Sequence, residues 1–379
     1  MPSRLFVVIV FGLLGLLHGY IGAQLLPDLP IGMAGRAAGA ALLAASFVLI
    51  PLSLLSTRLR RRVGDGLIWA GLLALGLFSS LLVLTALREL LRLALNGFGA
   101  AGPRFDEMSA IVVVAFALLA SAVGFLNARR RARVVEVDVP IAGLAPALHG
   151  FTIAQISDIH VGTTVRRPYL DAIVDAVNGL RADLVAITGD LVDGSVARLA
   201  PHTAPLARLR ARHGAYFVTG NHEYYSGAEA WTAEVSRLGI RVLANEHVVL
   251  DHDGAPVLVA GVTDYTAHLF DPAQRSDPAA ALAGAPPDSG PKILLAHQPR
   301  SAAAAADAGF DLQLSGHTHG GQFWPWNHFV RLQQPFTAGL HKLRTLWVYT
   351  SRGTGYWGPP KRLGAPSEIT RLRLVAAPR

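Results

Sequence analysis

The 379-residue sequence contains no cysteine, which excludes disulfide bonds and thiolate metal ligands. Any bound metal ion would therefore take nitrogen and oxygen donors. Charged residues are also scarce, at 16% of the chain, and the mean hydropathy is +0.38. A value this positive is unusual for a wholly soluble protein, and the length exceeds that of one typical domain. The composition therefore indicates a membrane region joined to a separate domain.

The basic excess is confined to one part of the chain. The net charge is +8, but residues 1–150 hold 13 Arg against 7 Asp and Glu, which leaves only about +2 for the remainder. This excess lies beside the apolar segments, where topology signals occur, and not in a folded domain that could form a basic groove. The charge distribution therefore argues against a nucleic-acid partner.

Four apolar segments are long enough to cross a bilayer, which takes about 20 residues each. They cover residues 5–26, 37–55, 67–87 and 108–126. A cleaved signal peptide would account for the first segment alone. We therefore predict an all-α transmembrane region of four helices in residues 1–130 and a second domain in residues 131–379.

Arginine clusters give the expected orientation of this region. One cluster lies between the second and third segments (Arg58, Arg60, Arg61 and Arg62), and another follows the fourth (Arg129, Arg130, Arg131 and Arg133). By the positive-inside rule, both termini and the second domain would be cytoplasmic. Arg88, Arg92 and Arg104, in the loop between the third and fourth segments, oppose this orientation.

After residue 133 the pattern changes to short apolar runs that alternate with helical periodicity, which is typical of an α/β domain. The predicted helices cover residues 168–180, 228–238 and 301–308. The predicted strands cover residues 134–139, 152–156, 184–188, 216–219, 257–260, 293–296, 312–314 and 346–350.

Five of these strands end in polar residues that suit divalent metal ions. The clusters are 157–160, 189–193, 220–223, His297 and 315–322. The carboxyl ends of strands in α/β sheets converge on the ligand crevice, so these clusters are expected to meet. Asp158 and His160 are two positions apart, as are His317 and His319, and an extended segment would direct each pair to one side. A lone histidine in a strand is usually structural, but five such clusters in this order predict a metal site.

The motifs D-x-H, GD-x-x-D, GNH-[DE], a lone H and GH-x-H resemble the calcineurin-like metallophosphoesterase superfamily. The Gly-His-Thr-His-Gly-Gly-Gln run and Ser351-Arg352-Gly353 look like its membrane-associated bacterial branch. The resemblance covers residues 134–375. It implies a four-layer sandwich of two mixed β-sheets flanked by helices, and a location in the bacterial inner membrane.

The resemblance also implies a site for two divalent ions, of manganese, iron or zinc. One ion would be bound by Asp158, His160 and His319, the other by Asn221, His297 and His317, with Asp190 bridging both. Two ions about 3.5–4 Å apart would lower the pKa of a bridging water, and the hydroxide would attack the phosphorus. His222 would assist the leaving group. Asp193 and Glu223 are expected to orient ligand or catalytic histidines, and a turn cap is the alternative for Asp193.

The resemblance therefore implies metal-dependent hydrolysis of phosphoesters. Aromatic residues in 323–329 and at 356–357 would form a lipid-facing rim, with a lipid-linked substrate, or pack in the core. Arg352 would contact substrate phosphate or form a structural salt bridge. A nucleotide or nucleic-acid phosphodiesterase is one alternative, although a nuclease needs a basic groove. A non-catalytic membrane sensor or scaffold is another, although such a protein would be expected to lack ligands. The sequence is silent on oligomeric state.

Overall fold

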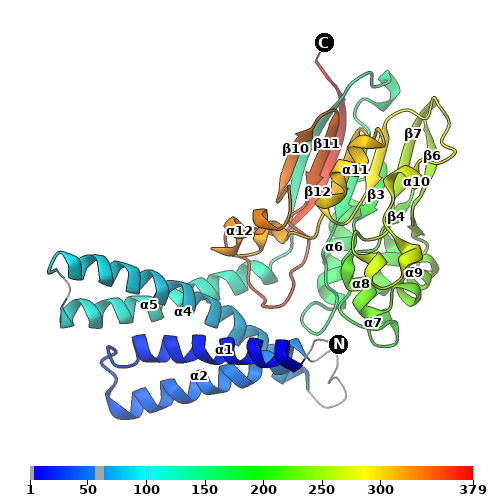
Figure 1. Ribbon diagram of the computed structural model, residues 1–379. Helices are drawn as coiled ribbons and strands as arrows, with labels where there is room; N and C mark the ends of the chain where they lie inside the picture. The colour runs from blue at the N-terminus through cyan, green and yellow to red at the C-terminus, as the bar shows by residue number, and fades with distance from the viewer. Residues whose placement is uncertain (1–3, 56–63, 101, 379) are drawn as a thin grey trace. The chain divides into compact units, whose positions relative to one another are not determined.

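A computed structural model describes residues 4–55, 64–100 and 102–378 (Figure 1). Its contacts divide the chain into two compact units. The helical unit comprises Met1–Asn127 and Gly358–Lys361, and the α/β unit comprises Ala128–Trp357 and Arg362–Arg379.

Among the described residues, four helices are long and apolar enough to cross a membrane, as predicted. They are α1 (Arg4–Leu25), α2 (Gly32–Leu54), α4 (Asp65–Gly97) and α5 (Pro103–Arg129). Helix α4 extends well beyond the predicted end at residue 87, because residues 88–97 hold good helix formers and contain no proline. The predicted cytoplasmic arginines 58, 60, 61 and 62 lie outside the described residues.

Arg88 is buried inside the helical unit, with 3% of its surface exposed. Its guanidinium donates to Gln24 O at 2.8 Å and to Ser109 Oγ at 2.8 Å. It also forms ion pairs with Asp28 and with Glu89. A buried charge is tolerated only when it is paired and fully hydrogen-bonded, so this arginine is a structural member of the helical unit.

The segment Gly358–Lys361 also belongs to the helical unit, although it is distant in sequence from the four helices. The side chain of Lys361 is buried, and its Nζ donates to Gly76 O at 2.8 Å and to Ser121 Oγ at 3.3 Å. These contacts join α4 to α5 through a residue near the C-terminus of the chain.

The described residues of the α/β unit form two six-stranded mixed sheets. The first has the order β1 (Arg133–Ile141), β12 (Glu368–Ala376), β2 (Thr152–Ile156), β3 (Leu184–Ile187), β4 (Ala215–Phe217) and β5 (Arg241–Val242). The second has the order β10 (Gly339–Leu343), β11 (Leu346–Thr350), β9 (Leu312–Ser315), β8 (Lys292–Leu295), β7 (Ala255–Gly261) and β6 (Glu246–His252). Strands β2 to β5 are parallel, and so are β7, β8, β9 and β11, whereas β12 runs antiparallel to β2.

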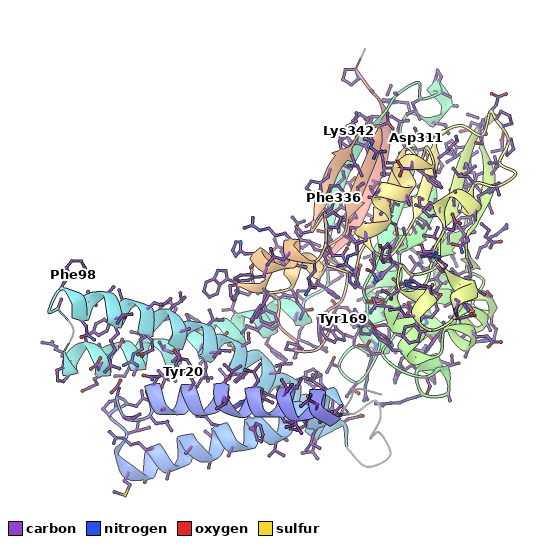
Figure 2. All side chains as sticks on the ribbon, viewed as in Figure 1. Tyr20, Phe98, Tyr169, Asp311, Phe336 and Lys342 are labelled. Atoms are coloured by element: carbon purple, nitrogen blue, oxygen red, sulfur yellow. The ribbon has the colours of Figure 1, made fainter. Side chains whose placement is uncertain are left out.

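Three apolar clusters hold the layers together, because successive strand residues face opposite sides of a sheet. Ile153 and Leu184 point into the core between the two sheets, whereas Ala154 and Val185 pack beneath helices on the outer face. Those outer helices include α6 (Arg167–Gly179), α7 (Val196–Thr203) and α9 (Ala228–Arg237), and α11 (Ala302–Asp307) covers the second sheet. Figure 2 shows the described side chains as sticks on the ribbon. The predicted four-layer α/β sandwich is confirmed.

Candidate metal centre

The loops that follow β2, β3, β4, β8 and β9 carry the predicted metal ligands, and the structure brings six of these seven residues, all except Asn221, into two clusters of three. The strands are short and almost fully buried, so their main chain is fixed on both faces. The ligand-bearing loops therefore begin from rigid positions, which favours a preorganised site.

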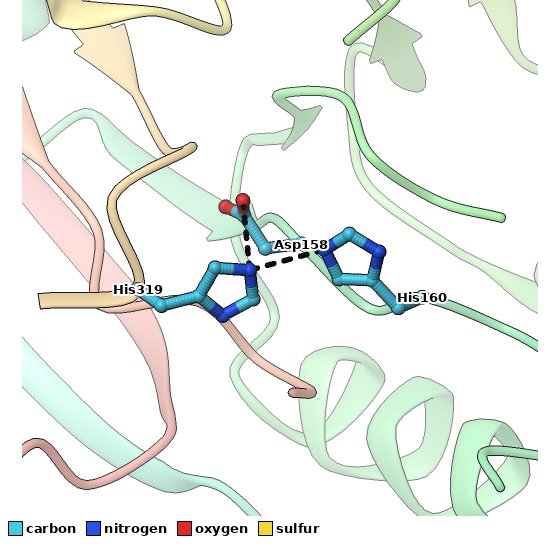
Figure 3. Close-up of side chains that lie close together, drawn as sticks. All are labelled: Asp158, His160 and His319. Atoms are coloured by element: carbon cyan, nitrogen blue, oxygen red, sulfur yellow. Dashed lines mark hydrogen bonds and ion pairs between the residues drawn. The ribbon is translucent and has the colours of Figure 1, made fainter. Parts of the chain in front are cut away.

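The first cluster comprises Asp158, His160 and His319 (Figure 3). The Nε2 atoms of the two histidines are 3.0 Å apart, and His319 Nε2 lies 3.5 Å from Asp158 Oδ1. Two imidazole ligands, each about 2.1 Å from one ion, would be about 3.4 Å apart in a tetrahedral site and about 3.0 Å apart at a right angle. The spacing of this buried cluster therefore suits a single shared metal ion.

The second cluster comprises Asp190, His297 and His317. His297 Nε2 lies 3.2 Å from Asp190 Oδ2 and 3.2 Å from His317 Nδ1. Asn221 is buried, and its Oδ1 has no hydrogen-bond partner within the described residues. A buried amide oxygen without a partner is costly, and coordination to a cation would satisfy it. These donors also fit a divalent ion.

Asp190 lies between the two clusters. Its Oδ2 atom is 3.8 Å from His160 Nε2 in the first cluster and 3.2 Å from His297 Nε2 in the second. Its Oδ1 accepts a hydrogen bond of 2.9 Å from the backbone N–H of His222. One carboxylate is thus within reach of both ligand groups, the position that a bridging ligand requires.

Hydrogen bonds on the far side of two imidazoles determine which nitrogen faces the clusters. His297 Nδ1 is 2.7 Å from Thr188 O, which can only accept, so this nitrogen carries the proton. His160 Nδ1 is 3.1 Å from Asp193 Oδ1 and donates to that carboxylate. In both residues the Nε2 lone pair is therefore directed at the cluster, as metal ligation needs.

His222 belongs to neither of these two clusters, but with His160 and Asp193 it forms a third group of side chains that could hold a metal ion. Its Nδ1 donates to Asp193 Oδ1 at 2.6 Å, and its Nε2 is 4.0 Å from Asp190 Oδ2. Burial alone would lower the pKa of His222, but the carboxylates of Asp190 and Asp193 raise it to about 9. Asp193 therefore contacts both His160, a predicted ligand, and His222.

Glu223 was expected to orient a histidine, but its carboxylate binds backbone amides. It is fully buried in the first turn of α8 (Asn221–Ser226). Its two oxygens accept hydrogen bonds from the N–H groups of Asp190, Leu191, Val192 and Gly220. Glu223 thus joins the loop after β3 to the loop after β4, and it fixes the main chain that carries Asp190.

The segments that carry the predicted ligands are not extended. The prediction that an extended backbone directs each pair of ligands to one side is therefore wrong. Non-glycine residues rarely adopt positive φ, and such residues cluster at functional sites. Five of the predicted ligands have φ between 51° and 70°, namely Asp158, His160, Asp190, His317 and His319. The tertiary structure holds each of them in this unfavourable conformation while their side chains converge.

Glycine is required where the loops pass close to the ligands. A Cβ atom at Gly316 would collide with Ser157 Oγ and Asp158 Oδ2. Gly189 has a φ of 86°, and a Cβ there would lie 2.8 Å from His297 Nδ1. Side chains at these two positions would displace ligands of both clusters.

Arg352, a predicted substrate contact, forms an ion pair with buried Glu368. Its Nη1 donates to Glu368 Oε2 at 2.9 Å, and its backbone N–H donates to Glu368 Oε1 at 3.1 Å. The geometry matches the salt-bridge alternative for this residue.

Arg362 was not identified from the sequence, although it contacts the predicted ligand His319 directly. It is 1% exposed, and its Nη2 lies 3.0 Å from His319 Nδ1. The guanidinium also donates to the backbone carbonyls of His319, Arg352, Gly355 and Ala365. No sequence pattern marks this role, because the acceptors come from three separate segments.

We expect Arg362→Met to lower the free energy of unfolding by at least about 3 kcal/mol, because several buried carbonyls lose their donor. Loss of the hydrogen bond to the His319 carbonyl oxygen would also release the main chain of this predicted ligand and lower the affinity for one metal ion by about 10- to 100-fold. Thermal unfolding and metal titration measure the two effects. Arg373→Met is a matched control, because Arg373 pairs with Asp138 on the exposed surface. Equal metal affinity in the Arg362 variant and the control would contradict this role.

Known proteins are similar to the part of the chain that carries the two clusters. The calcineurin-like phosphoesterase family matches residues 151–321. The chain is 44% identical over 269 residues to a bovine "transmembrane protein with metallophosphoesterase domain", an alignment that covers 68% of this chain and 60% of the bovine protein. It is 35% identical over 270 residues to an uncharacterized metallophosphoesterase of Campylobacter jejuni, covering 71% of this chain and 69% of that protein.

Among solved structures, the chain is similar to a 5'-nucleotidase precursor from Thermus thermophilus. The identity is 17% and the TM-score 0.39, with 59% of this chain and 54% of that chain covered. The curated relatives include animal and bacterial proteins, so they do not decide between the branches of this group. The chain spans 60% of the length of the bovine relative.

Proposed function

The chain belongs to the calcineurin-like metallophosphoesterase family, and from this we propose that it hydrolyses phosphoesters at a centre of two divalent metal ions. Seven side chains would hold the ions, namely Asp158, His160, Asp190, Asn221, His297, His317 and His319. Two such ions, when bound, activate water as a nucleophile and offset negative charge on the phosphoryl group. The position of Asp190 Oδ2, within 4 Å of a histidine nitrogen in each cluster, is the observation that carries this proposal.

The chain's own side chains would then orient the ligands and assist the leaving group. Asp193 holds His160 so that its Nε2 faces the first cluster. The same Asp193 oxygen accepts from His222 Nδ1, which leaves His222 Nε2 free to donate to the departing oxygen of the substrate. General acid assistance of this kind contributes about 10²–10⁴-fold to the rate.

Hydrolysis of bis(p-nitrophenyl) phosphate and p-nitrophenyl phosphate by the purified full chain tests the proposal. We expect turnover with added Mn²⁺, which EDTA abolishes and fresh metal restores, and elemental analysis should find two ions per chain. Iron and Zn²⁺ are compared in the same assay, because all three suit nitrogen and oxygen donors. A chain that binds two ions but hydrolyses neither ester would be a sensor or scaffold.

We further propose that the substrate is lipid-linked or lies at the membrane surface. The protein is a membrane protein, and large apolar side chains are exposed beside the metal centre. The ring of His222 is 5.2 Å from Tyr225 and 5.7 Å from Trp357, and Tyr225 contacts Phe270 at 5.6 Å. Tyr225 is 62% exposed, and Phe270 and Trp357 are about half exposed. Trp and Tyr favour the interface of a bilayer, which supports a lipid-facing rim.

The segment after His319 adds to this rim only in part. Trp324, Trp326 and Phe329 are each at least 40% exposed, whereas Phe323 and Tyr356 are buried in the core. Comparing turnover of a long-chain lipid phosphoester in mixed micelles with its short-chain soluble analogue tests the lipid proposal. A marked preference for the soluble analogue would count against it.

For sidedness, we propose that the α/β unit faces the cytoplasm, at the bacterial inner membrane. Two arginines that opposed this orientation are paired within the helical unit: Arg88 with Asp28, and Arg92 with Asp106 at 3.0 Å. Their positive charges are therefore engaged in structural ion pairs. A C-terminal reporter that is active only on the cytoplasmic side is expected, and activity on the opposite side would overturn the orientation.

A further inference from the structure

A small pocket opens beside the second ligand cluster of the metal centre. Its volume is about 170 Å³, and the proposed ligands Asn221 and His317 form part of its wall. The rest of the wall is formed by Tyr225, Thr266, Gln298, Arg300, Gln333 and Gln334. Whole ligands usually occupy about 300–1,000 Å³, so a pocket of this size holds one part of a substrate. A phosphoryl group at the metal centre would direct one of its ester substituents into this pocket.

The pocket wall is mostly polar. Among the described residues that line it, each has a side chain that can form hydrogen bonds, and none is a carboxylate. Four are amides, which both donate and accept hydrogen bonds. Amide side chains therefore suit hydroxyl groups, which also donate and accept, whereas an acyl chain would leave them without partners at a cost.

A buried carboxylate fixes two of the four amides of this wall, those of Gln298 and Gln334. Asp264 is fully buried and accepts hydrogen bonds from Gln298 Nε2 at 3.1 and 3.2 Å and from the backbone N–H of Thr266 at 2.8 Å. Because the NH₂ group of the Gln298 amide is bound to Asp264, the amide oxygen of Gln298 faces Gln334. This oxygen, Oε1, accepts a hydrogen bond from Gln334 Nε2 at 3.3 Å. The network thus sets the orientation of both amides before any ligand arrives, which favours specific recognition.

Arg300 is the one guanidinium among the described lining residues, and its contacts hold it at the pocket. Its Nε and Nη2 both donate to Gln333 O, at 2.9 and 2.6 Å. A single exposed arginine among neutral amides does not provide the charge density of a second phosphate site. It can donate to a hydroxyl or ether oxygen as the amides do.

We propose that this pocket binds a neutral, hydroxyl-bearing group esterified to the phosphate, so that the preferred substrates are phosphoesters of glycerol or of a sugar. The inference rests on the proposed phosphoesterase function and specifies its substrate class. The pocket volume corresponds to about six water molecules, which matches a glycerol unit of six non-hydrogen atoms. Tyr225 belongs both to the pocket wall and to the exposed aromatic rim, so a lipid substrate would place its polar head in the pocket and its chain on the rim.

Paired substrates test the proposal on the full chain in detergent with Mn²⁺. Glycerol 3-phosphate and n-propyl phosphate share a three-carbon chain and differ in two hydroxyl groups, while p-nitrophenyl phosphate, which has an activated leaving group and no hydroxyl group, reports whether the metal centre turns over. Sites built to hydrogen-bond hydroxyls reject analogues without them strongly, by up to about 10⁴-fold. We expect kcat/KM to favour glycerol 3-phosphate over n-propyl phosphate by at least about 10²-fold.

Two variants locate the preference in the pocket. Gln298→Leu and Gln334→Leu are expected to reduce the ratio of the two kcat/KM values to below about tenfold while p-nitrophenyl phosphate is still hydrolysed. Gln274→Leu is the matched control, because Gln274 binds the Tyr224 hydroxyl and does not line the pocket. That control should keep the wild-type ratio.

The outcomes separate this inference from the proposed function. A wild-type ratio near one, or an unchanged ratio in both folded pocket variants, would overturn the hydroxyl pocket while p-nitrophenyl phosphate turnover still supported the phosphoesterase. Absence of turnover for every ester by the metal-loaded wild type would overturn the phosphoesterase and the pocket proposal with it. The wild-type comparison decides the matter even where a variant fails to fold.

Discussion

Asp190→Ala is expected to lower phosphoesterase turnover by at least about 10³-fold and to reduce the bound metal at both sites. The Oδ2 atom of Asp190 lies 3.8 Å from His160 Nε2 and 3.2 Å from His297 Nε2, so a single side chain serves both ligand groups. Removing it would leave each proposed ion with fewer protein ligands, and the two positive charges would lose the carboxylate that offsets their repulsion. Elemental analysis and turnover of an activated phosphoester measure the two effects.

Loss of the Asp190 carboxylate would also disturb the loop beside it. Its Oδ1 accepts from the backbone N–H of His222, and this bond fixes the start of α8. Asp190→Asn keeps an acceptor for that N–H while removing the charge. It should therefore fold like the wild type and still bind less metal.

Asp183→Asn is the matched control for these two variants. Asp183 also lies next to β3, and its carboxylate accepts from Thr152 N and Thr152 Oγ1, away from the clusters. Its loss should lower the free energy of unfolding by about 1–2 kcal/mol and leave metal content unchanged. If Asp190→Ala kept two ions per chain, the bridging role would be refuted.

Local sequence patterns predicted much of the fold because most strands are buried runs with a polar residue at the carboxyl end. Strands β2 and β11 begin and end at the predicted residues. Strand β12 was missed, and it lies between β1 and β2 in the first sheet. This order depends on pairings such as Thr370 with Gln155, which join the two ends of the domain and leave no local signal.

The candidate site was predictable in its residue types but not in its conformation. Spacing alone placed Asp158 near His160, yet both have positive φ, which the surrounding packing imposes. The partners of Glu223 are backbone amides, and those of Arg362 are chiefly backbone carbonyls. Groups of this kind are present at every position of a chain, so no side-chain pattern identifies the residue that binds them.

His222→Ala is expected to leave both metal ions in place. It should slow hydrolysis more for esters whose leaving group has a higher pKa. For an alkyl phosphate, whose leaving oxygen needs a proton, turnover should fall by about 10²–10⁴-fold. For p-nitrophenyl phosphate, whose leaving group departs as a stable anion, we expect a loss of about tenfold or less. The reason is that His222 Nδ1 is bound to Asp193 and its Nε2 remains available to the substrate.

A steeper dependence of the rate on leaving-group pKa is therefore the signature of the missing donor, and a merely structural role would not produce it. His213→Ala is the control, because His213 binds His252 outside the clusters and its loss removes an imidazole without touching a ligand. That control should keep the wild-type dependence for both esters. Equal losses of turnover for the alkyl and nitrophenyl esters in His222→Ala would instead indicate that the imidazole only holds Asp193 and His160 in place. The reason is that His160 Nδ1 and His222 Nδ1 both bind Asp193 Oδ1.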